Sequence, residues 1–212
     1  MWPAGEFMNR QEFIQTLVTL LVTIDRGMSA FDTPLPEKVE ESIKLALIGF
    51  GNEAIPILHE NLSRFAPDVD LNSLIEVLGI IRNPSSTSYI IEFHKNHSSF
   101  LSGLVAMNAL RKLRAEAGYL YMSELLLRQS AGDQTAFNTS AEIVVACKSL
   151  GEWDDPQAMK PLMEATRIRD IQGMPEAAID ALAKYPKAHN FLKNLAVEDP
   201  SLKELIAKVT SS

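Results

Sequence analysis

Cysteine is almost absent from this chain of 212 residues, which contains Cys147 alone. A single cysteine excludes an intramolecular disulfide and a multi-cysteine zinc site. Cys147 ends the apolar run 143–147, so we predict that it is a small buried hydrophobe and not a nucleophile. Catalytic signatures are also missing: the sequence has no G-x-S-x-G, no H-E-x-x-H, no glycine-rich phosphate loop and no dinucleotide fingerprint. We therefore predict a protein that is not an enzyme, with no catalytic residue and no cofactor.

Long hydrophobic runs are lacking as well. The most apolar stretch, residues 13–24, is interrupted by one glutamine and three threonines. It falls short of the roughly 18 to 20 apolar residues that span a bilayer. Its flanks lack the basic region and cleavage site of a signal peptide, so we expect a buried first helix and a cytoplasmic protein. Met8 fits a natural start, and residues 1–7 are expected to be a tail derived from expression.

Positive charge is in deficit, with a formal net charge of −7 and a pI near 5.2. Nucleic-acid binding depends on lysines and arginines that neutralise phosphates, which argues against a broad nucleic-acid platform. The deficit does not exclude a local patch. The basic residues that would form one are Arg64, Arg82, Lys95, Arg111, Lys112, Arg114 and Arg128. The alternative is that these are solvated charges at helix ends.

The sequence does contain an internal repeat. Residues 78–92, LGIIRNPSSTSYIIE, share a Leu-Gly pair, a proline and a glutamate with residues 150–164, LGEWDDPQAMKPLME. The two stretches lie 72 residues apart. Each has the pattern of a helix end, a tight turn entered through Asn-Pro or Asp-Pro, and a second amphipathic helix. No run alternates between polar and apolar residues as a half-buried strand does.

Helical periodicity extends this unit to about five helix pairs. They are expected at 37–48 with 53–64, 71–81 with 85–96, 100–113 with 116–129, 140–150 with 156–169, and 175–184 with 187–196. A preceding helix is expected over about 10–27, with its apolar face at Phe13, Leu17, Leu20, Leu21 and Ile24, and a capping segment over about 200–210. Val39 is expected in the core, Gly27 as a helix stop and 49–52 as a turn.

The residues that close the first helices of the pairs mark the register. They are Ile48, Leu78, Leu110, Leu150 and Leu182, at intervals of 30, 32, 40 and 32 residues. The one long interval is explained by an insertion at residues 130–139, which we expect to bulge outward as a loop. A helix pair cannot bury both of its apolar faces alone, so the pairs are expected to stack into a continuous core.

The pattern resembles the HEAT repeats, and its short period is similar to that of phycobilisome-lyase-like HEAT proteins. The residues that carry the resemblance are Gly49, Ala54-Ile55-Pro56 and Leu58; Leu78-Gly79 and Asn83-Pro84; and Leu150-Gly151, Asp155-Pro156, Ala158 and Leu162. It implies an all-α fold, a right-handed α-α superhelix in which residues 8–212 form one domain with repeats over about 37–196. It also implies a protein-binding scaffold or adaptor. The alternatives are a phycobilin-lyase-like subunit or chaperone that binds a tetrapyrrole, and a DNA-engaging helical repeat protein.

The most ordered polar feature is a set of four glutamates in the second helices. Glu60, Glu92, Glu124 and Glu164 are separated by 32, 32 and 40 residues and so occupy one repeat position. In HEAT-like folds the second helices line the concave surface, where aligned carboxylates would attract a protein or peptide segment that is basic or of mixed charge. The alternative is a set of solvated glutamates that favour helix and pair locally, for example Glu124 with Arg128.

Histidines and one tryptophan complete the candidates. His94 and His97 share a helix face, as two metal ligands would, but a third ligand is not evident and we predict no metal site. His94 is expected to be packed and His97 to cap its helix. Trp153 lies in the turn of the fourth pair, either as an exposed interaction anchor or as local packing. The oligomeric state is left open.

Overall fold

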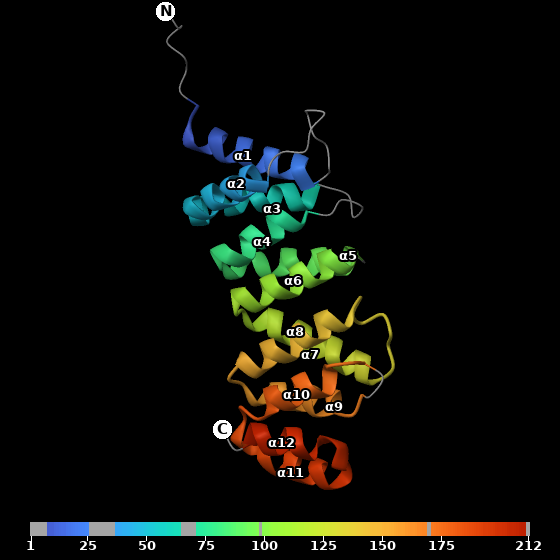
Figure 1. The fold of residues 1–212 in the computed structure, drawn as a ribbon. Helices are drawn as coiled ribbons and strands as arrows, with labels where there is room; N and C mark the ends of the chain where they lie inside the picture. The colour runs from blue at the N-terminus through green and yellow to red at the C-terminus, as the bar shows by residue number, and fades with distance from the viewer. Residues whose placement is uncertain (1–7, 26–36, 65–70, 98, 169–170, 211–212) are drawn as a thin grey trace, which may run out of the picture.

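A computed structural model describes residues 8–25, 37–64, 71–97, 99–168 and 171–210. Within these ranges the chain is all-helical, with twelve α-helices and five short 3₁₀-helices, and none of the described residues forms a strand. The helices are stacked along one long axis from the N-terminal to the C-terminal end (Figure 1). None of the helices in the described ranges has the length and apolar character needed to cross a membrane.

The α-helices are α1 Arg10–Asp25, α2 Glu37–Phe50, α3 Ile55–Arg64, α4 Asn72–Ile81, α5 Thr87–Asn96, α6 Phe100–Leu113, α7 Glu116–Ser130, α8 Ser140–Glu152, α9 Met159–Ala165, α10 Met174–Leu182, α11 His189–Glu198 and α12 Lys203–Thr210. The 3₁₀-helices are η1 Gly51–Glu53, η2 Pro84–Ser86, η3 Pro156–Ala158, η4 Pro186–Ala188 and η5 Pro200–Leu202. The predicted pairs are present, although α9 ends four residues before the predicted boundary.

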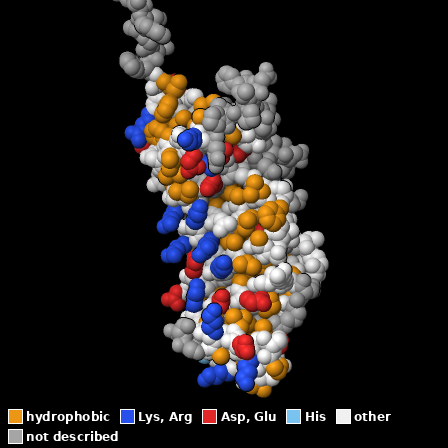
Figure 2. Space-filling view, in the orientation of Figure 1, with side chains coloured by type: hydrophobic (Ala, Val, Ile, Leu, Met, Phe, Trp, Pro, Cys, Tyr) orange, Lys and Arg blue, Asp and Glu red, His pale blue; other side chains and the backbone are white. Residues whose placement is uncertain are grey.

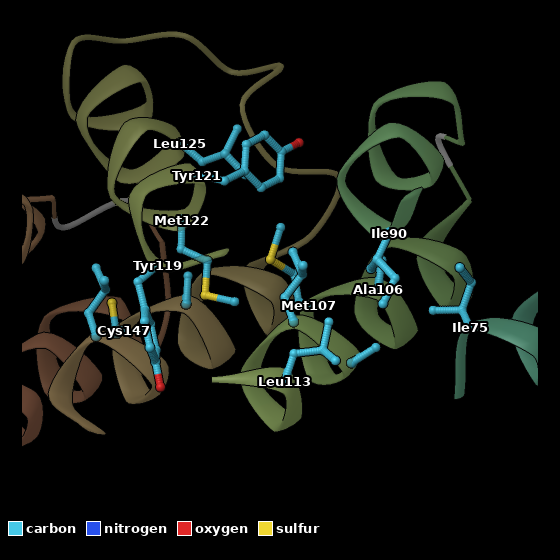
Figure 3. Close-up of a cluster of buried hydrophobic side chains, with 14 of the residues drawn as sticks. Ile75, Ile90, Ala106, Met107, Leu113, Tyr119, Tyr121, Met122, Leu125 and Cys147 are labelled. Carbon is cyan, nitrogen blue, oxygen red and sulfur yellow. The ribbon is translucent and has the colours of Figure 1, made fainter. Parts of the chain in front are cut away.

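The helices are arranged in two layers. The first helices of the pairs contact one another in series, from α2 through α4, α6, α8 and α10 to α12. The second helices α3, α5, α7 and α9 form the other series. Helix α1 packs on α2, α3 and α4 and so covers the N-terminal end of the stack. The apolar core runs between the layers, and Figure 3 shows its central part, where Met107, Met122 and Cys147 come from three successive helices.

Three of the turns between consecutive helices have a local cause. Asn83, Asp155 and Asp199 each precede a proline, and each side chain accepts a hydrogen bond from the backbone N–H two residues on, at 2.9, 2.8 and 3.0 Å. The proline fixes the first φ of the 3₁₀ turn and needs no hydrogen-bond acceptor. The Asn-Pro and Asp-Pro turns predicted from the sequence are therefore confirmed.

The glycine of the Leu-Gly pair is a packing residue rather than a turn residue. Gly79 lies inside α4, and a Cβ atom placed on it would lie 2.8 Å from the Cα atom of Ala109 in α6. Gly151 in α8 meets Ala181 of α10 in the same way, with its Cβ position 2.9 Å from the Cα atom. Glycine is needed at both positions because two helix backbones approach each other there. Gly49 has no atom within 4 Å of its Cβ position and serves no such contact.

Several predicted core and turn residues are placed differently. Helix α1 buries a face made of Ile14, Leu17, Val18, Leu21 and Val22, so Phe13 and Leu20 are 45% and 42% exposed, and Val39 of α2 is 37% exposed. Helix α2 continues through Gly49 and Phe50, and the turn is confined to η1. Leu47, not Ile48, is the fully buried residue there. The predicted stop at Gly27 lies outside the described residues.

The insertion at residues 130–139 packs onto the core instead of bulging away from it. Ala136 and Phe137 are only 2% and 6% exposed. Asp133 shapes the segment, because its carboxylate accepts hydrogen bonds from the backbone N–H and hydroxyl of Thr135 at 2.9 and 2.6 Å. Arg128 of α7 donates to the same carboxylate, and these bonds lower the pKa of Asp133 to about 2.

Candidate functional site

The four glutamates of the second helices lie in one structural register. Two residues before each glutamate lies a side chain with no exposed surface: Leu58, Ile90, Met122 and Leu162. Because α3, α5, α7 and α9 contact one another in series, this shared core position sets the four glutamates at equivalent points of neighbouring helices. Glu60, Glu92 and Glu124 are exposed, and Glu164 is half-buried.

The local partners of these carboxylates differ from one helix to the next. Glu92 accepts a hydrogen bond from the side chain of Asn96 at 2.9 Å, and Glu164 pairs with Arg167 at 3.3 Å. The predicted pair of Glu124 with Arg128 is wrong. Arg128 forms its ion pair with Asp133 at 2.7 Å, because the packed insertion brings that carboxylate closer.

A hollow of about 370 Å³ lies beside Glu92. Leu62 and Ser63 line it from α3, and Tyr89, Glu92, Phe93 and Asn96 line it from α5, with His97 at its end. Two ring stacks build its wall: His59 lies on Tyr89 with centroids 3.8 Å apart, and Phe93 lies on His97 with centroids 3.9 Å apart. The hollow thus combines aromatic surface with one carboxylate, a combination that suits a cationic side chain.

A second hollow of about 200 Å³ adjoins the first, because Asn96 and His97 line both. Its other walls come from α7, through Tyr121, Leu125 and Arg128, and from the insertion, through Thr135 and Asn138. The ammonium group of Lys95 lies 5.6 Å from the centroid of the Tyr121 ring. Cations line this hollow where a carboxylate lines the first, so the surface along α5 and α7 is of mixed charge.

A buried polar network lies behind the second hollow. The Nδ1 atom of His94 is 2.7 Å from the hydroxyl of Tyr121, and its Nε2 atom is 3.0 Å from Oε2 of Glu142. Glu142 has no exposed surface and also accepts from the backbone N–H of Asn138 at 3.3 Å. Burial raises the pKa of Tyr121 to about 12, which keeps its hydroxyl a neutral partner in the network. The network joins α5, α7 and α8 to the insertion.

The room for the Glu142 carboxylate is provided by Gly103 of α6, since a Cβ atom there would overlap the carboxylate. Glu142 was not among the site residues predicted from the sequence. A signal was present, because Thr139 caps α8 and Glu142 follows three residues later, as in a capping box. That pattern indicates a helix start but not burial, which depends on the histidine and glycine of other helices.

The histidines have structural partners. His94 is packed and His97 caps α5, as predicted, with its Nδ1 atom 2.8 Å from the carbonyl of Phe93. His59 lies 2.9 Å from the hydroxyl of Ser86, and burial lowers its pKa. His189 lies 3.1 Å from the carbonyl of Ala183. Within the described ranges, no group of three histidine, cysteine, aspartate or glutamate side chains is placed to hold a metal ion.

Trp153 is packed between two repeats. Its ring stacks on Tyr119 of α7 with centroids 5.1 Å apart and an interplanar angle of 10°. Its carbonyl and that of Leu150 accept hydrogen bonds from the hydroxyl of Tyr185 in the next turn. The indole is half-buried against the core, so the structure favours local packing for this residue over an exposed anchor.

The basic residues do not form one continuous patch. Arg64, Lys95 and Arg128 lie in the last turns of second helices, whereas Arg82, Arg111, Lys112 and Arg114 lie at the ends of first helices. First and second helices run in opposite directions, so these two groups lie at opposite edges of the stack (Figure 1). The surface along α5 and α7 and the turn edge near Arg114 are therefore separate candidate sites.

Comparison with known proteins gives no further guide, because no protein-family model, curated protein or solved structure matches the chain. The fold defines a class only: an all-helical protein whose helix pairs are stacked in two layers.

Proposed function

We propose that the chain is a non-enzymatic protein-binding scaffold, built as a right-handed HEAT-like solenoid, whose second helices receive a basic segment of a partner protein. The observation that carries this proposal is the hollow beside Glu92, where a carboxylate and the rings of Tyr89 and Phe93 line one cavity. An arginine or lysine side chain gains both a charge-assisted hydrogen bond and a ring contact in such a cavity.

The shared register supports a segment longer than one side chain. Glu60 lies on α3, which lines the hollow together with α5, and Glu124 lies on α7, the next second helix; both are exposed. A peptide running across α3, α5 and α7 passes the carboxylates in turn, so that the spacing of its cations sets its position. Helical repeat arrays bind extended partners in this way, because each repeat adds a similar strip of surface.

The test is binding of a fluorescent arginine-rich peptide, measured by anisotropy at low ionic strength. Replacing Glu60, Glu92, Glu124 and Glu164 with glutamine is expected to weaken binding about tenfold, because each exposed ion pair contributes modestly. The matched control replaces Glu116, Glu176, Glu198 and Glu204, which are exposed glutamates at other helix positions. Both variants change the net charge equally. Equal weakening by both would show that the peptide responds to net charge only, and the proposed surface would be rejected.

A further inference from the structure

Three cations surround one carboxylate at the turn edge of the third to fifth pairs. Arg111 of α6 forms an ion pair with Glu152 of α8, with its Nε atom 3.2 Å from Oε2. The pKa of Glu152 is lowered first by this bond and then by the nearby charges of Lys184 and Arg114. Neither Arg114 nor Lys184 forms a direct ion pair with any residue that the structure describes, and both are exposed. The three cations therefore outnumber the one carboxylate that they surround, and Asp154 and Asp155 follow it in the same turn.

Figure 2 shows the same imbalance at larger scale. Lysine and arginine side chains gather along one edge in the middle of the molecule, on the left of the view, with few acidic side chains among them. Lys112 is not part of the cluster around Glu152, because it lines a different hollow with Glu76 and Asn108 on the first-helix layer.

The backbone of Arg114 is a second observation. Its φ is 53°, in the left-handed region that glycine adopts at less cost. The helix dipole favours a cation at a helix end, but Arg111 and Lys112 already occupy the last turn of α6. At Arg82, where φ is 60°, the dipole is a sufficient reason, since the last turn of α4 has no basic residue. Arginine at position 114 is explained by neither the backbone nor the dipole.

We propose that the cluster of Arg111, Arg114 and Lys184 binds an acidic segment of a protein partner. Arginines bind carboxylates through two parallel N–H donors, and Arg114 has both free to do so. A nucleic acid fits less well, because its affinity comes from many phosphate contacts along a basic track. Here the three cations are followed along the edge by Asp154 and Asp155, so they do not continue into such a track. A short stretch of aspartates or glutamates needs only the cluster.

The test uses a fluorescent glutamate-rich peptide and the full chain at low ionic strength. The variant Arg114→Gly with Lys184→Ala is expected to bind about three- to tenfold more weakly. Glycine adopts the positive φ of position 114 at less cost than arginine. The melting temperature of this double variant should therefore equal or exceed that of the wild type. The matched control is Arg82→Gly with Lys193→Ala, which relieves the same backbone strain and removes two cations outside the cluster. It should bind the peptide as the wild type does.

Three results would overturn the proposal: no binding of the peptide to the wild type, equal weakening by both double variants, or tighter binding of single-stranded DNA than of the peptide. Lys184→Ala alone keeps the backbone of α6 untouched, and it should weaken binding about twofold. If it has no effect, Lys184 does not contact the partner and the cluster is not the site. The glutamates of the second helices are unchanged in every variant.

Discussion

Asp25 makes the stability of the N-terminal end of the stack depend on pH. Asp25 is the last residue of α1. Its carboxylate accepts hydrogen bonds from the backbone N–H and the hydroxyl of Ser73 in α4, at 3.1 and 2.6 Å. Burial raises its pKa from 3.8 to about 6, and the neighbouring charge of Glu40 adds to this rise. The bonds from Ser73 and the charge of Lys44 oppose it without cancelling it.

The direction follows from proton linkage. The folded chain binds this proton more tightly than the unfolded chain. Below the unfolded pKa of 3.8 the carboxyl is protonated in both states, so Asp25 then has little effect on the free energy of unfolding. As the pH rises through about 6, the folded state must hold a buried charge and loses stability. A rise of about 2 pKa units corresponds to about 3 kcal/mol, and about 1–3 kcal/mol is expected once relaxation and partial solvation are included.

The perturbation is Asp25→Asn, which preserves the shape of the neutral acid. We expect the variant to be about 1–3 kcal/mol more stable than the wild type near pH 8 and equal to it near pH 4. Urea denaturation at a series of pH values measures both, and the difference between the two chains removes the contribution of all other carboxylates. Asp154→Asn, at an exposed position, is the control and should show no such trend. A difference that stays constant with pH, or a variant less stable at pH 8, would refute the reasoning.

Two further predictions concern the glycines. Gly79→Ala should lower the free energy of unfolding by about 1–3 kcal/mol, because the added Cβ atom would overlap the backbone of Ala109. Gly49→Ala should raise the free energy of unfolding by about 0.5–1 kcal/mol, because no neighbouring atom lies close to that helix position. Thermal and urea unfolding compare them, and equal effects would contradict the close helix contact. Glu142→Ala should cost about 3 kcal/mol by stranding a buried histidine, and Gly103→Ala should cost less in that background than in the wild type. Additive losses in the double variant would mean that the glycine does not make room for the carboxylate.

The helix pairs were predictable from the sequence because their causes are local. Leucines at helical spacing and the turn chemistry of Asn83-Pro84 and Asp155-Pro156 each act within a few residues, and the structure has helices where they predict them. The alignment of the four glutamates could also be predicted from their sequence intervals. A buried residue lies two positions before the glutamate in each of the helices α3, α5, α7 and α9. Periodicity and turn chemistry were therefore sufficient to predict the helix pairs.

Periodicity does not show which other helix a given residue packs against. The apolar residues of α1 nearly surround the helix, so only its contacts with α2, α3 and α4 decide that Ile14 is buried and Phe13 exposed. Gly79 had the sequence context of a turn, and its role depends on Ala109 thirty residues later. Glu142 had the marks of an ordinary exposed helix start. Its burial requires His94 and Gly103, which lie in two other helices.

The longest repeat interval is also where the carboxylate of Glu142 is buried in the core, and the two facts are connected. A buried carboxylate needs several hydrogen-bond partners. The second helices provide only one to Glu142, the imidazole of His94 in α5. The additional residues of the insertion bring the backbone N–H of Asn138 and the hydroxyl of Thr139 to Glu142. The same segment places Asn138 and Thr135 in the hollow above the network. A longer connection thus supplies hydrogen-bond donors to a buried carboxylate on one side and lines the second hollow on the other.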